Sequence, residues 1–489
     1  MKHLKKLLII LYILPCLFIF NACSLLEEEK VYITNIAQTD VVGNIATYTI
    51  YYSDGSTSLF TVTNGKDGED GEDGEDAEFL SIQSIKDYCD ENNLNFEEFL
   101  AEYLTINQIN NNIQIDSTQS VQEATNVAIQ SAVTVWCEFP EKDYYNNKKT
   151  SLACGAGVVY KMESQYSYIA TNYHVVYYPD CETTNNIANK ITIFQYGGDE
   201  TVYKNGTDAN GYPTYSYGNG AITAEYIGGS LNFDLAVLKV KTSDLLSFNE
   251  HASAVKLAND YCLGETAIAI GNPECEGFSV TSGIISVVSE TIDMTGADEK
   301  TKCSFRVMRI DTAVNGGNSG GGLFNMKGEL IGIVNAKSVS SDIDNIAYAL
   351  PVDNVYKVLD NLIYYNKNFS AESCVKKLVL NIEYTSENSH AVYDATTNRT
   401  TVVDELNVET VTPGGVGYII GLKVDDVITA ITINGVKHEI TRSYQLSEWL
   451  LTIRAGDKFI LTVERGNETH ELGITNSIGV LETQLEEIK

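Results

Sequence analysis

From Val127 to Val352 the chain alternates short runs of β-branched and aromatic residues with turns rich in Gly, Asn and Asp. No long run in this range places its apolar residues at the spacing of a helix. Short strands separated by such turns are typical of β-barrels and β-sandwiches, so the pattern predicts an all-β domain. Apolar residues then follow a helical spacing from Asp353 to Tyr364, which predicts a helix that closes this domain.

Two further β-rich regions flank the predicted domain. Residues 374–475 are predicted to form a second β-rich module. Residues 476–489 are predicted to be a tail. Near the other end, three strand-like runs between Val31 and Asn64 predict a small β module over residues 23–64.

An acidic repeat over residues 65–78 follows the small β module. Glycine recurs at every third position, but the repeat lacks proline and is short, so a collagen triple helix is not expected. Its carboxylates repel one another and predict an extended tether. Residues 79–120 are predicted to hold a short helical segment and a linker. The chain carries a formal charge of −33, which argues against nucleic-acid binding.

The first 22 residues have the features of a secretory signal peptide. Three lysines precede an apolar run that ends at Phe20 and is too short to span a bilayer. Cys23, directly after Ala22, resembles the acceptor of a bacterial lipoprotein signal, so Cys23 is the predicted lipidation site. We therefore expect a membrane-anchored protein outside the cytoplasm. Secretion without a lipid and an uncleaved anchor are the alternatives.

The candidate chemistry centres on a serine among glycines. Ser319 follows Gly316 and Gly317 and lies just before a predicted strand. Glycines permit the tight turn in which backbone N–H groups can point at a developing oxyanion. The arrangement is typical of a nucleophilic serine for acyl transfer, although a glycine-rich hairpin loop has the same composition.

A candidate base and a candidate acid precede Ser319 in the chain. His174 follows a short apolar run, whereas His251 lies in a polar stretch typical of a loop. Asp234 begins an apolar strand, where its carboxylate can accept the imidazole N–H and fix the tautomer. Each residue alone would also fit a surface or turn position. The order His, Asp, Ser, each beside β-type sequence, predicts a catalytic triad.

Around these residues the chain resembles the HtrA/DegP serine proteases. The matching blocks are Thr171–Val176, Asp234–Val240 and Gly317–Gly321, and the resemblance covers roughly residues 125–475. It implies a chymotrypsin-like protease domain over residues 121–366, built from two six-stranded β-barrels with the catalytic groups in the cleft between them. It also implies an endopeptidase that degrades unfolded or damaged proteins, and a homotrimer.

The resemblance gives each matched residue a role. Ser319 would be the nucleophile, His174 the general base and then acid, and Asp234 the carboxylate that orients the imidazole. The N–H groups of Gly317 and Ser319 would form the oxyanion hole.

Two departures from the family pattern fall in the serine loop. Family members usually carry proline at the position of Gly316, and often at that of Gly322. More glycine means a more flexible unbound loop, so we expect an oxyanion hole that forms when substrate or an activator binds.

The resemblance also locates the substrate pocket. Ala313, six residues before the serine, would form the floor of the primary pocket, beside Val314. Because this floor is uncharged, we expect cleavage after small or medium aliphatic residues. Asn335, Ala336 and Lys337 follow a predicted strand and would pair with the substrate backbone.

The chain has ten cysteines. Removal of Cys16 with the signal and lipidation of Cys23 would leave an even number, which is compatible with disulfides outside the cell. Cys154 precedes the strand that leads to His174, and Cys181 follows this histidine, so a disulfide across the histidine loop is a candidate. No CxxC or HExxH spacing predicts a metal site, and no cofactor is expected.

Residues 179–220 are rich in Tyr, Asn, Gly and Thr and lengthen the chain relative to most members of the family. Such an insertion could be a regulatory or intersubunit loop over the cleft, or a surface hairpin.

The module over residues 374–475 resembles a PDZ domain through Val411–Ile428, and the resemblance implies a groove helix from Ser443 to Ile453. PDZ grooves add a peptide strand and clamp its terminal carboxylate in a backbone nest. The nest would fall at Lys377–Leu380, where Val379 replaces the usual glycine and resists positive φ. A catalytically silent PDZ scaffold or chaperone is a second hypothesis for the whole chain, and an adhesion protein that uses the acidic repeat is a third. The intact His, Asp and Ser favour the protease.

Overall fold

The computed structural model describes residues 33–42, 45–52, 57–63, 120–337, 346–369 and 373–488. The chain divides into two units, residues 1–107 and residues 108–489. The predicted signal peptide, Cys23, the acidic tether and the helical segment after it lie outside the described residues. Within the described ranges, no helix is both long and apolar enough to cross a membrane.

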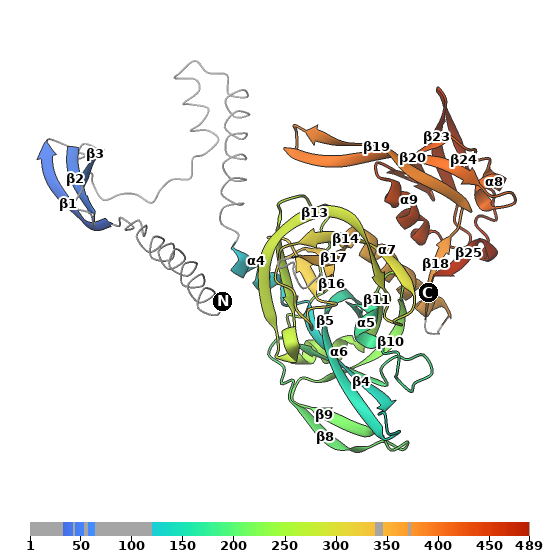
Figure 1. Ribbon diagram of the computed structural model, residues 1–489, viewed down its shortest axis with the longest axis horizontal. Helices are drawn as coiled ribbons and strands as arrows, with labels where there is room; N and C mark the ends of the chain where they lie inside the picture. The colour runs from blue at the N-terminus through green and yellow to red at the C-terminus, as the bar shows by residue number, and fades with distance from the viewer. Residues whose placement is uncertain are drawn as a thin grey trace, which may run out of the picture. The chain divides into compact units, whose positions relative to one another are not determined.

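The described part of the first unit is a three-stranded antiparallel sheet, drawn in blue in Figure 1. Its strands β1 (Ile33–Val42), β2 (Ile45–Tyr52) and β3 (Thr57–Thr63) each pair with the next in the chain. The three strand-like runs predicted between Val31 and Asn64 are therefore strands.

Six strands of the second unit close a first β-barrel, in the order β10, β11, β6, β5, β4, β7. Their inward residues, such as Val135, Ile169 and Leu238, are fully buried. The short helices α4 (Val121–Ala128) and α6 (Thr242–Phe248) flank the barrel in the sequence. The strands are β4 (Ala132–Lys142), β5 (Lys148–Met162), β6 (Tyr166–Thr171), β7 (Lys190–Gln195), β10 (Ile222–Ser230) and β11 (Leu235–Lys241).

The next six strands close a second barrel, in the order β12, β13, β14, β17, β16, β15. Ile285, Met308 and Val334 are fully buried in its core. The predicted mainly β fold with two six-stranded barrels is therefore confirmed. The strands are β12 (Thr266–Gly271), β13 (Ser279–Thr295), β14 (Lys302–Ile310), β15 (Gly322–Phe324), β16 (Leu330–Lys337) and β17 (Ala347–Pro351).

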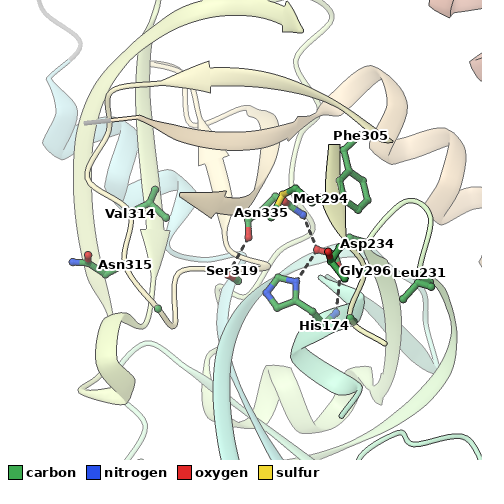
Figure 2. Close-up of a pocket in the computed structure, with 13 residues that line it drawn as sticks. His174, Leu231, Asp234, Met294, Gly296, Phe305, Val314, Asn315, Ser319 and Asn335 are labelled. Carbon is green, nitrogen blue, oxygen red and sulfur yellow. Dashed lines mark hydrogen bonds and ion pairs between the residues drawn. The ribbon is translucent and has the colours of Figure 1, made fainter. Parts of the chain in front are cut away.

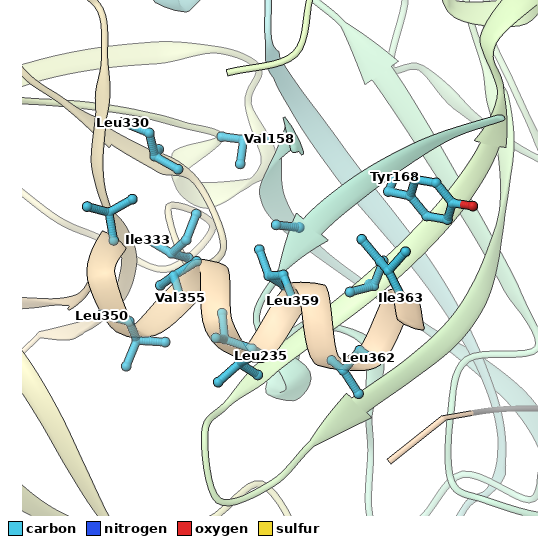
Figure 3. Close-up of a cluster of buried hydrophobic side chains, with 14 of the residues drawn as sticks. Val158, Tyr168, Leu235, Leu330, Ile333, Leu350, Val355, Leu359, Leu362 and Ile363 are labelled. Carbon is cyan, nitrogen blue, oxygen red and sulfur yellow. The ribbon is translucent and has the colours of Figure 1, made fainter. Parts of the chain in front are cut away.

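Helix α7 (Val352–Phe369) packs against both barrels, as Figure 3 shows. Its buried residues Val355, Leu359, Leu362 and Ile363 recur at intervals of one helical turn and form one apolar face. Burial of each such side chain stabilises the fold by about 1.5–3 kcal/mol. The helix predicted from Asp353 to Tyr364 is thus confirmed and extends a further turn. The same cluster contains Val158 and Leu235 of the first barrel and Leu330, Ile333 and Leu350 of the second.

The region predicted as an insertion has two parts. Residues 190–195 form the barrel strand β7, so this part is not an insertion. Strands β8 (Val202–Thr207) and β9 (Pro213–Tyr217) form a separate hairpin. This hairpin is bound to the first barrel, where Thr150 Oγ1 donates to the Pro213 carbonyl at 2.7 Å. The segment is thus a hairpin on the first barrel, and its regulatory or intersubunit role stays a prediction.

The C-terminal module has a core of its own, which includes Leu406, Leu446 and Phe459. The helix predicted from Ser443 to Ile453 is α9 (Ser443–Trp449), which continues as a 3₁₀ turn over Leu450–Thr452. The other elements are β18 (Val375–Leu378), β19 (Ile382–Asp394), β20 (Arg399–Val411), α8 (Val416–Ile420), β21 (Val427–Ile433), β22 (Val436–Glu439), β23 (Phe459–Arg465), β24 (Glu468–Ile474) and β25 (Leu485–Ile488).

The prediction that residues 476–489 form a tail is wrong. Strand β25 pairs with β18 at the start of the module, with Lys376 opposite Glu487 and Lys377 opposite Glu486. Opposite charges on facing positions favour this register. The apolar ends of β25 supply the physical reason for its docking, since Leu485 is buried against the module core.

A buried ion cluster connects β14, α7 and α9. Arg306 donates from Nη2 to Asp353 Oδ2 at 2.7 Å and from Nε to Glu448 Oε1 at 2.6 Å. Lys357 Nζ lies 3.3 Å from the other Glu448 oxygen. The side chains of Arg306 and Glu448 are each only 8% exposed. Burial raises the pKa of Glu448 above its ordinary value, although Arg306 acts in the opposite direction.

Candidate active site

Two neighbouring strands of the first barrel bring His174 and Asp234 together. His174 lies in the one-turn helix α5 (Tyr173–Val176), directly after β6, and Asp234 directly precedes β11. Because β6 and β11 are antiparallel, with Thr171 opposite Ala236, the end of one strand lies beside the start of the other. Asp234 adopts a positive φ of 47° in this tight turn, a conformation that Asp tolerates better than most residues.

The Asp234 carboxylate binds both the backbone and the ring of His174. Oδ1 accepts from the His174 backbone N–H at 2.9 Å, and Oδ2 lies 2.7 Å from Nδ1. Asp234 is buried, whereas the His174 side chain is 37% exposed. Desolvation by its surroundings lowers the pKa of His174, but the charge and hydrogen bond of Asp234 outweigh it and raise this pKa above 6.5. The ring is therefore oriented with Nε2 as its remaining polar atom.

Two asparagines hold Asp234 in place. Asn335, near the end of β16, donates from Nδ2 to Asp234 Oδ2 at 2.6 Å, and Asn172 donates to the Asp234 backbone carbonyl at 2.8 Å. Sequence analysis placed Asn335 after a strand, whereas it lies within β16, and missed its contact with the carboxylate. Both asparagines are buried. A buried amide that donates to an ionised carboxylate is a charge-assisted bond of the stronger kind.

Ser319 lies in the turn before β15, opposite His174 in the same cavity (Figure 2). Its hydroxyl donates to the backbone carbonyl of Asn335 at 3.1 Å. Its own carbonyl accepts from the Ala156 N–H on β5 at 2.9 Å. Among the described residues, the Ser319 hydroxyl makes no hydrogen bond to the His174 ring. The serine is thus beside the His–Asp pair, with its hydroxyl bound to the main chain.

The residues before Ser319 form a closed turn. Asn318 N–H donates to the Asn315 carbonyl at 3.1 Å, and Gly317, the third residue of the turn, has a φ of 95°. A positive φ at this position defines turns of type II and favours glycine. A Cβ on Gly317 would lie 1.9 Å from the Asn272 carbonyl oxygen, whereas Gly316 faces open space. Within the described ranges, the amides of Gly317 and Ser319 donate no hydrogen bond to the protein, which leaves both N–H groups for a ligand.

The cavity between the barrels has a volume of about 340 Å³. Ser319, His174, Asp234 and Asn335 line it, together with the apolar side chains of Leu231, Met294, Phe305 and Val314. These side chains surround the catalytic candidates in Figure 2. An apolar wall with a few polar groups at one end is typical of a site for an apolar side chain.

The prediction that Ala313 forms the floor of this pocket is wrong. Ala313 is exposed and does not line the cavity, and its carbonyl accepts a hydrogen bond from Thr281 Oγ1 at 2.8 Å. Val314, the next residue, is buried and lines the cavity instead. Ala336 and Lys337 are the last residues of β16, where they pair with Tyr348 and Ala347 of β17.

The prediction of a disulfide between Cys154 and Cys181 is also wrong. Cys154 on β5 is bonded to Cys275, which follows β12, with 5.8 Å between the Cα atoms. Cys181 is a buried thiol whose Sγ lies 3.5 Å from the Ile187 carbonyl oxygen. In the part of the chain that the structure describes, no group of three or more His, Cys, Asp or Glu side chains could hold a metal ion.

Comparison with known proteins adds independent findings. Residues 155–333 match the family described as "Trypsin-like peptidase domain". The serine protease Do-like HtrB of Bacillus subtilis (strain 168) is 28% identical over 325 residues, which are 65% of this chain and 61% of that protein. A serine protease HtrA-like protein of Staphylococcus aureus (strain MRSA252) is 32% identical over 257 residues, 52% of this chain and 29% of that protein. The match therefore spans about three fifths of the length of the Bacillus subtilis protein.

Among solved structures, a serine endoprotease from Yersinia pestis aligns with 23% identity and a TM-score of 0.39, over 73% of this chain and 97% of that one. The barrels and the family match together define the class: this chain contains a trypsin-like peptidase domain. Its relatives place it more closely. The chain is similar to serine proteases of the HtrA type.

Proposed function

We propose that the chain is a serine endopeptidase in which Ser319 is the nucleophile, His174 the general base and acid, and Asp234 the orienting carboxylate. The observation that carries the proposal is the 2.7 Å bond between His174 and Asp234 at the wall of the cavity that Ser319 also lines. The raised pKa of His174 suits a base that must bind a proton in the transition state.

In the proposed reaction, the Ser319 hydroxyl leaves the Asn335 carbonyl and transfers its proton to Nε2 of His174 as it attacks the scissile carbonyl. Asp234 stabilises the imidazolium, and Asn335 keeps Asp234 in position. The N–H groups of Gly317 and Ser319 stabilise the oxyanion, and one such donor contributes about 3–4 kcal/mol to the transition state. His174 then protonates the leaving amine.

The cavity wall supports cleavage beside apolar residues. Leu231, Met294, Phe305 and Val314 carry no charge that could bind a substrate Lys or Arg. We therefore keep the preference for small or medium aliphatic residues, with Val314 in the role that sequence analysis gave to Ala313. Unfolded or damaged proteins suit this cleft because only an extended chain can pair with a strand beside the serine.

Several further features complete the proposal. A lipid on Cys23 would anchor the protein outside the cytoplasm, and the Cys154–Cys275 disulfide supports an oxidising compartment. The module over residues 374–475 would be a PDZ domain that binds substrate or regulates the site, and the enzyme would be a homotrimer. Replacement of Cys23 with alanine should move the protein from the membrane fraction to the soluble fraction, which tests the anchor.

A covalent probe tests the proposed catalysis. The full-length protein is incubated with a fluorophosphonate probe and, separately, with unfolded casein. We expect Ser319→Ala to abolish labelling and cleavage, and Ser247→Ala, which changes an exposed serine of α6, to retain both. A wild-type protein that neither binds the probe nor cleaves casein would overturn the endopeptidase and favour the binding scaffold or chaperone.

A further inference from the structure

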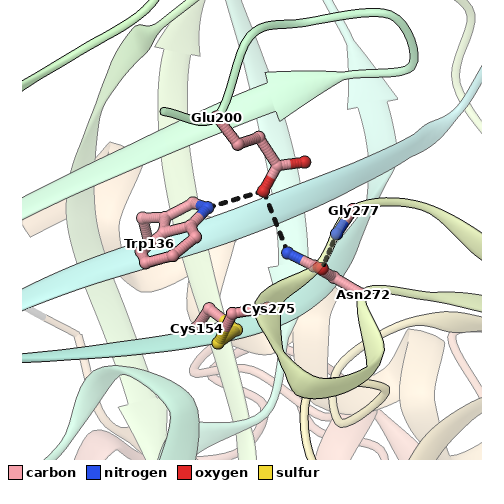
Figure 4. The surroundings of a disulfide bond; sticks show 6 residues. All are labelled: Trp136, Cys154, Glu200, Asn272, Cys275 and Gly277. Carbon is pink, nitrogen blue, oxygen red and sulfur yellow. Dashed lines mark hydrogen bonds between the residues drawn. A yellow bond between two sulfur atoms is a disulfide. The ribbon is translucent and has the colours of Figure 1, made fainter. Parts of the chain in front are cut away.

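The disulfide between Cys154 and Cys275 joins the two barrels beside the serine loop. Cys154 lies on β5 of the first barrel, and Cys275 ends the 3₁₀ turn Pro273–Cys275 that follows β12 of the second barrel. The two residues are 121 positions apart in the sequence. Figure 4 shows the disulfide next to the segment that runs from Asn272 to Gly277, which we call the support loop.

Residues beside each cysteine of the disulfide bind the backbone of the serine loop, residues 315–321. On the β5 side, Ala156 N–H donates to the Ser319 carbonyl at 2.9 Å. On the other side, Asn272 N–H donates to the Gly317 carbonyl at 3.2 Å, and Glu274 N–H donates to the Gly316 carbonyl at 2.8 Å. Three carbonyl groups of the serine loop are therefore held by residues within three positions of a bonded cysteine.

The support loop depends on restraints from outside itself. Glu274 and Cys275 have φ values of 56° and 61°, which cost about 1–3 kcal/mol for each non-glycine residue unless the surroundings enforce them. Asn272 is fully buried and accepts from Gly277 N–H at 2.7 Å. The disulfide is the covalent member of these restraints.

The support loop is also bound by the segment between β7 and β8. Glu200 Oε2 accepts from Asn272 Nδ2 at 3.0 Å and from Trp136 Nε1 at 2.6 Å, as Figure 4 shows. Trp136 belongs to β4 of the first barrel. The first barrel thus reaches the support loop by two routes, the disulfide and the Trp136–Glu200–Asn272 hydrogen bonds.

We propose that the Cys154–Cys275 disulfide and Asn272 are positioning elements of the oxyanion hole, so that the oxidation state of this cysteine pair sets the turnover rate. This inference rests on the proposed peptidase activity. Reduction by a dithiol transfers two electrons and two protons to the S–S bond, yields two thiols and converts the dithiol to its disulfide. Both cysteines are partly exposed, so a small dithiol can reach them.

Once the bond is broken, the support loop loses its link to β5, and the carbonyls of Gly316 and Gly317 lose a fixed partner. The Gly316 carbonyl belongs to the same peptide group as the Gly317 N–H, so this oxyanion donor then samples other directions, which removes transition-state stabilisation. The His174–Asp234 pair makes no contact with the disulfide in the described structure, so the pKa of His174 should stay unchanged. The expected result is a fall in kcat of about ten- to hundredfold with little change in KM, since displacement of a catalytic group by about 1 Å costs up to 10²-fold.

The test uses the full-length protein and compares its oxidised and dithiol-reduced states by casein cleavage, with the number of free thiols measured in parallel. We expect kcat to fall on reduction and to return on reoxidation, while the pH midpoint of the acid limb does not move. The variant Cys154→Ala/Cys275→Ala should start at the low rate and not respond to the dithiol. Cys262→Ala, at a partly exposed unpaired cysteine, should respond as wild type does.

A second variant keeps the proposal testable if the double cysteine variant does not fold. Glu200→Ala removes the acceptor of the Asn272 side-chain amide. The substitution should lower kcat more in the reduced protein than in the oxidised protein, because the reduced variant lacks both restraints. Equal rates before and after complete reduction of Cys154 and Cys275 would overturn the positioning role while the peptidase stands. Failure of the oxidised wild type to cleave casein would overturn both proposals.

Discussion

The side-chain amide of Asn335 donates a 2.6 Å hydrogen bond to the carboxylate oxygen of Asp234 that also contacts the His174 ring. The two residues are 101 positions apart and belong to different barrels. The same Asn335 accepts the Ser319 hydroxyl through its backbone carbonyl. Asn335 therefore contacts both the acid and the nucleophile of the proposed triad.

Removal of the Asn335 amide should slow catalysis. We expect Asn335→Ala to lower kcat about ten- to hundredfold, because a hydrogen bond to a charged group contributes roughly 1.5–3 kcal/mol and 1.36 kcal/mol is a factor of ten. Asn335→Asp should be worse at neutral pH, since it faces Asp234 with a second carboxylate, and its kcat relative to that of the wild type at the same pH should recover in part as the pH falls. The measurement is casein cleavage from pH 5 to 9, and Asn368→Ala on an exposed turn of α7 is the control. Wild-type kcat in Asn335→Ala would contradict the positioning role.

The pH dependence of the activity should follow His174. Because the base must be neutral, activity is present above its pKa and is lost as the pH falls through it. Asp234 raises this pKa, so we expect the acid limb of kcat/KM above pH 6.5. Asp234→Asn removes the carboxylate charge and should move the limb to lower pH while kcat falls about 10⁴-fold. His251→Ala, at a side chain that is 77% exposed, should leave the profile unchanged. An acid limb that stays in place in Asp234→Asn would refute the coupling.

Gly316 and Gly317 in the turn before Ser319 should differ sharply in how well they tolerate substitution. Gly316 faces open space, so Gly316→Ala should retain activity, and Gly316→Pro should stabilise the protein by about 0.4–1 kcal/mol by restricting the unfolded chain. Gly317→Ala should abolish activity, because its Cβ would meet the Asn272 carbonyl and its φ is 95°. Denaturant melts and casein cleavage of the three variants test this. Similar activities in Gly316→Ala and Gly317→Ala would show that the turn geometry is wrong.

The buried ion cluster should matter for stability rather than for chemistry. Arg306→Ala leaves Glu448 and Asp353 without their guanidinium partner and should lower the free energy of unfolding by about 3–5 kcal/mol. Lys437→Ala breaks an exposed pair with Glu439 and should change it by less than about 1 kcal/mol. Urea unfolding of both variants gives the comparison. Equal losses in the two variants would mean that Arg306 is solvated in solution.

Some features could be predicted because they depend on the sequence nearby. These are the two barrels, helix α7, and the placement of His174, Asp234 and Ser319 at the cavity. Apolar alternation defines the strands, and each cavity residue lies beside the end of a strand. Ala313 failed as the pocket floor because a position counted along the chain does not determine which way a side chain points. The neighbouring Val314 faces the cavity instead.

Other features depend on contacts between distant segments and left little trace in the sequence. Eight cysteines allow 105 pairings, so the partner of Cys154 could not be chosen before β5 and the support loop were known to meet. The hydrogen bond from the Asn335 amide to Asp234 depends on how the two barrels pack together. One signal was overlooked: Leu485-Glu486-Glu487-Ile488 is apolar at both ends and acidic in the middle, and so complements Val375-Lys376-Lys377-Leu378.

Helix α7 also sets the order in which the molecule can be completed. His174 and Asp234 belong to the first barrel, Ser319 and Asn335 to the second, and the helix that packs on both barrels follows them in the chain. A growing chain that has reached only the end of β11 can close the first barrel but contains no serine loop. Assembly of the proposed site therefore requires both barrels, and α7, the last of these elements in the chain, adds an apolar face that packs on the two of them.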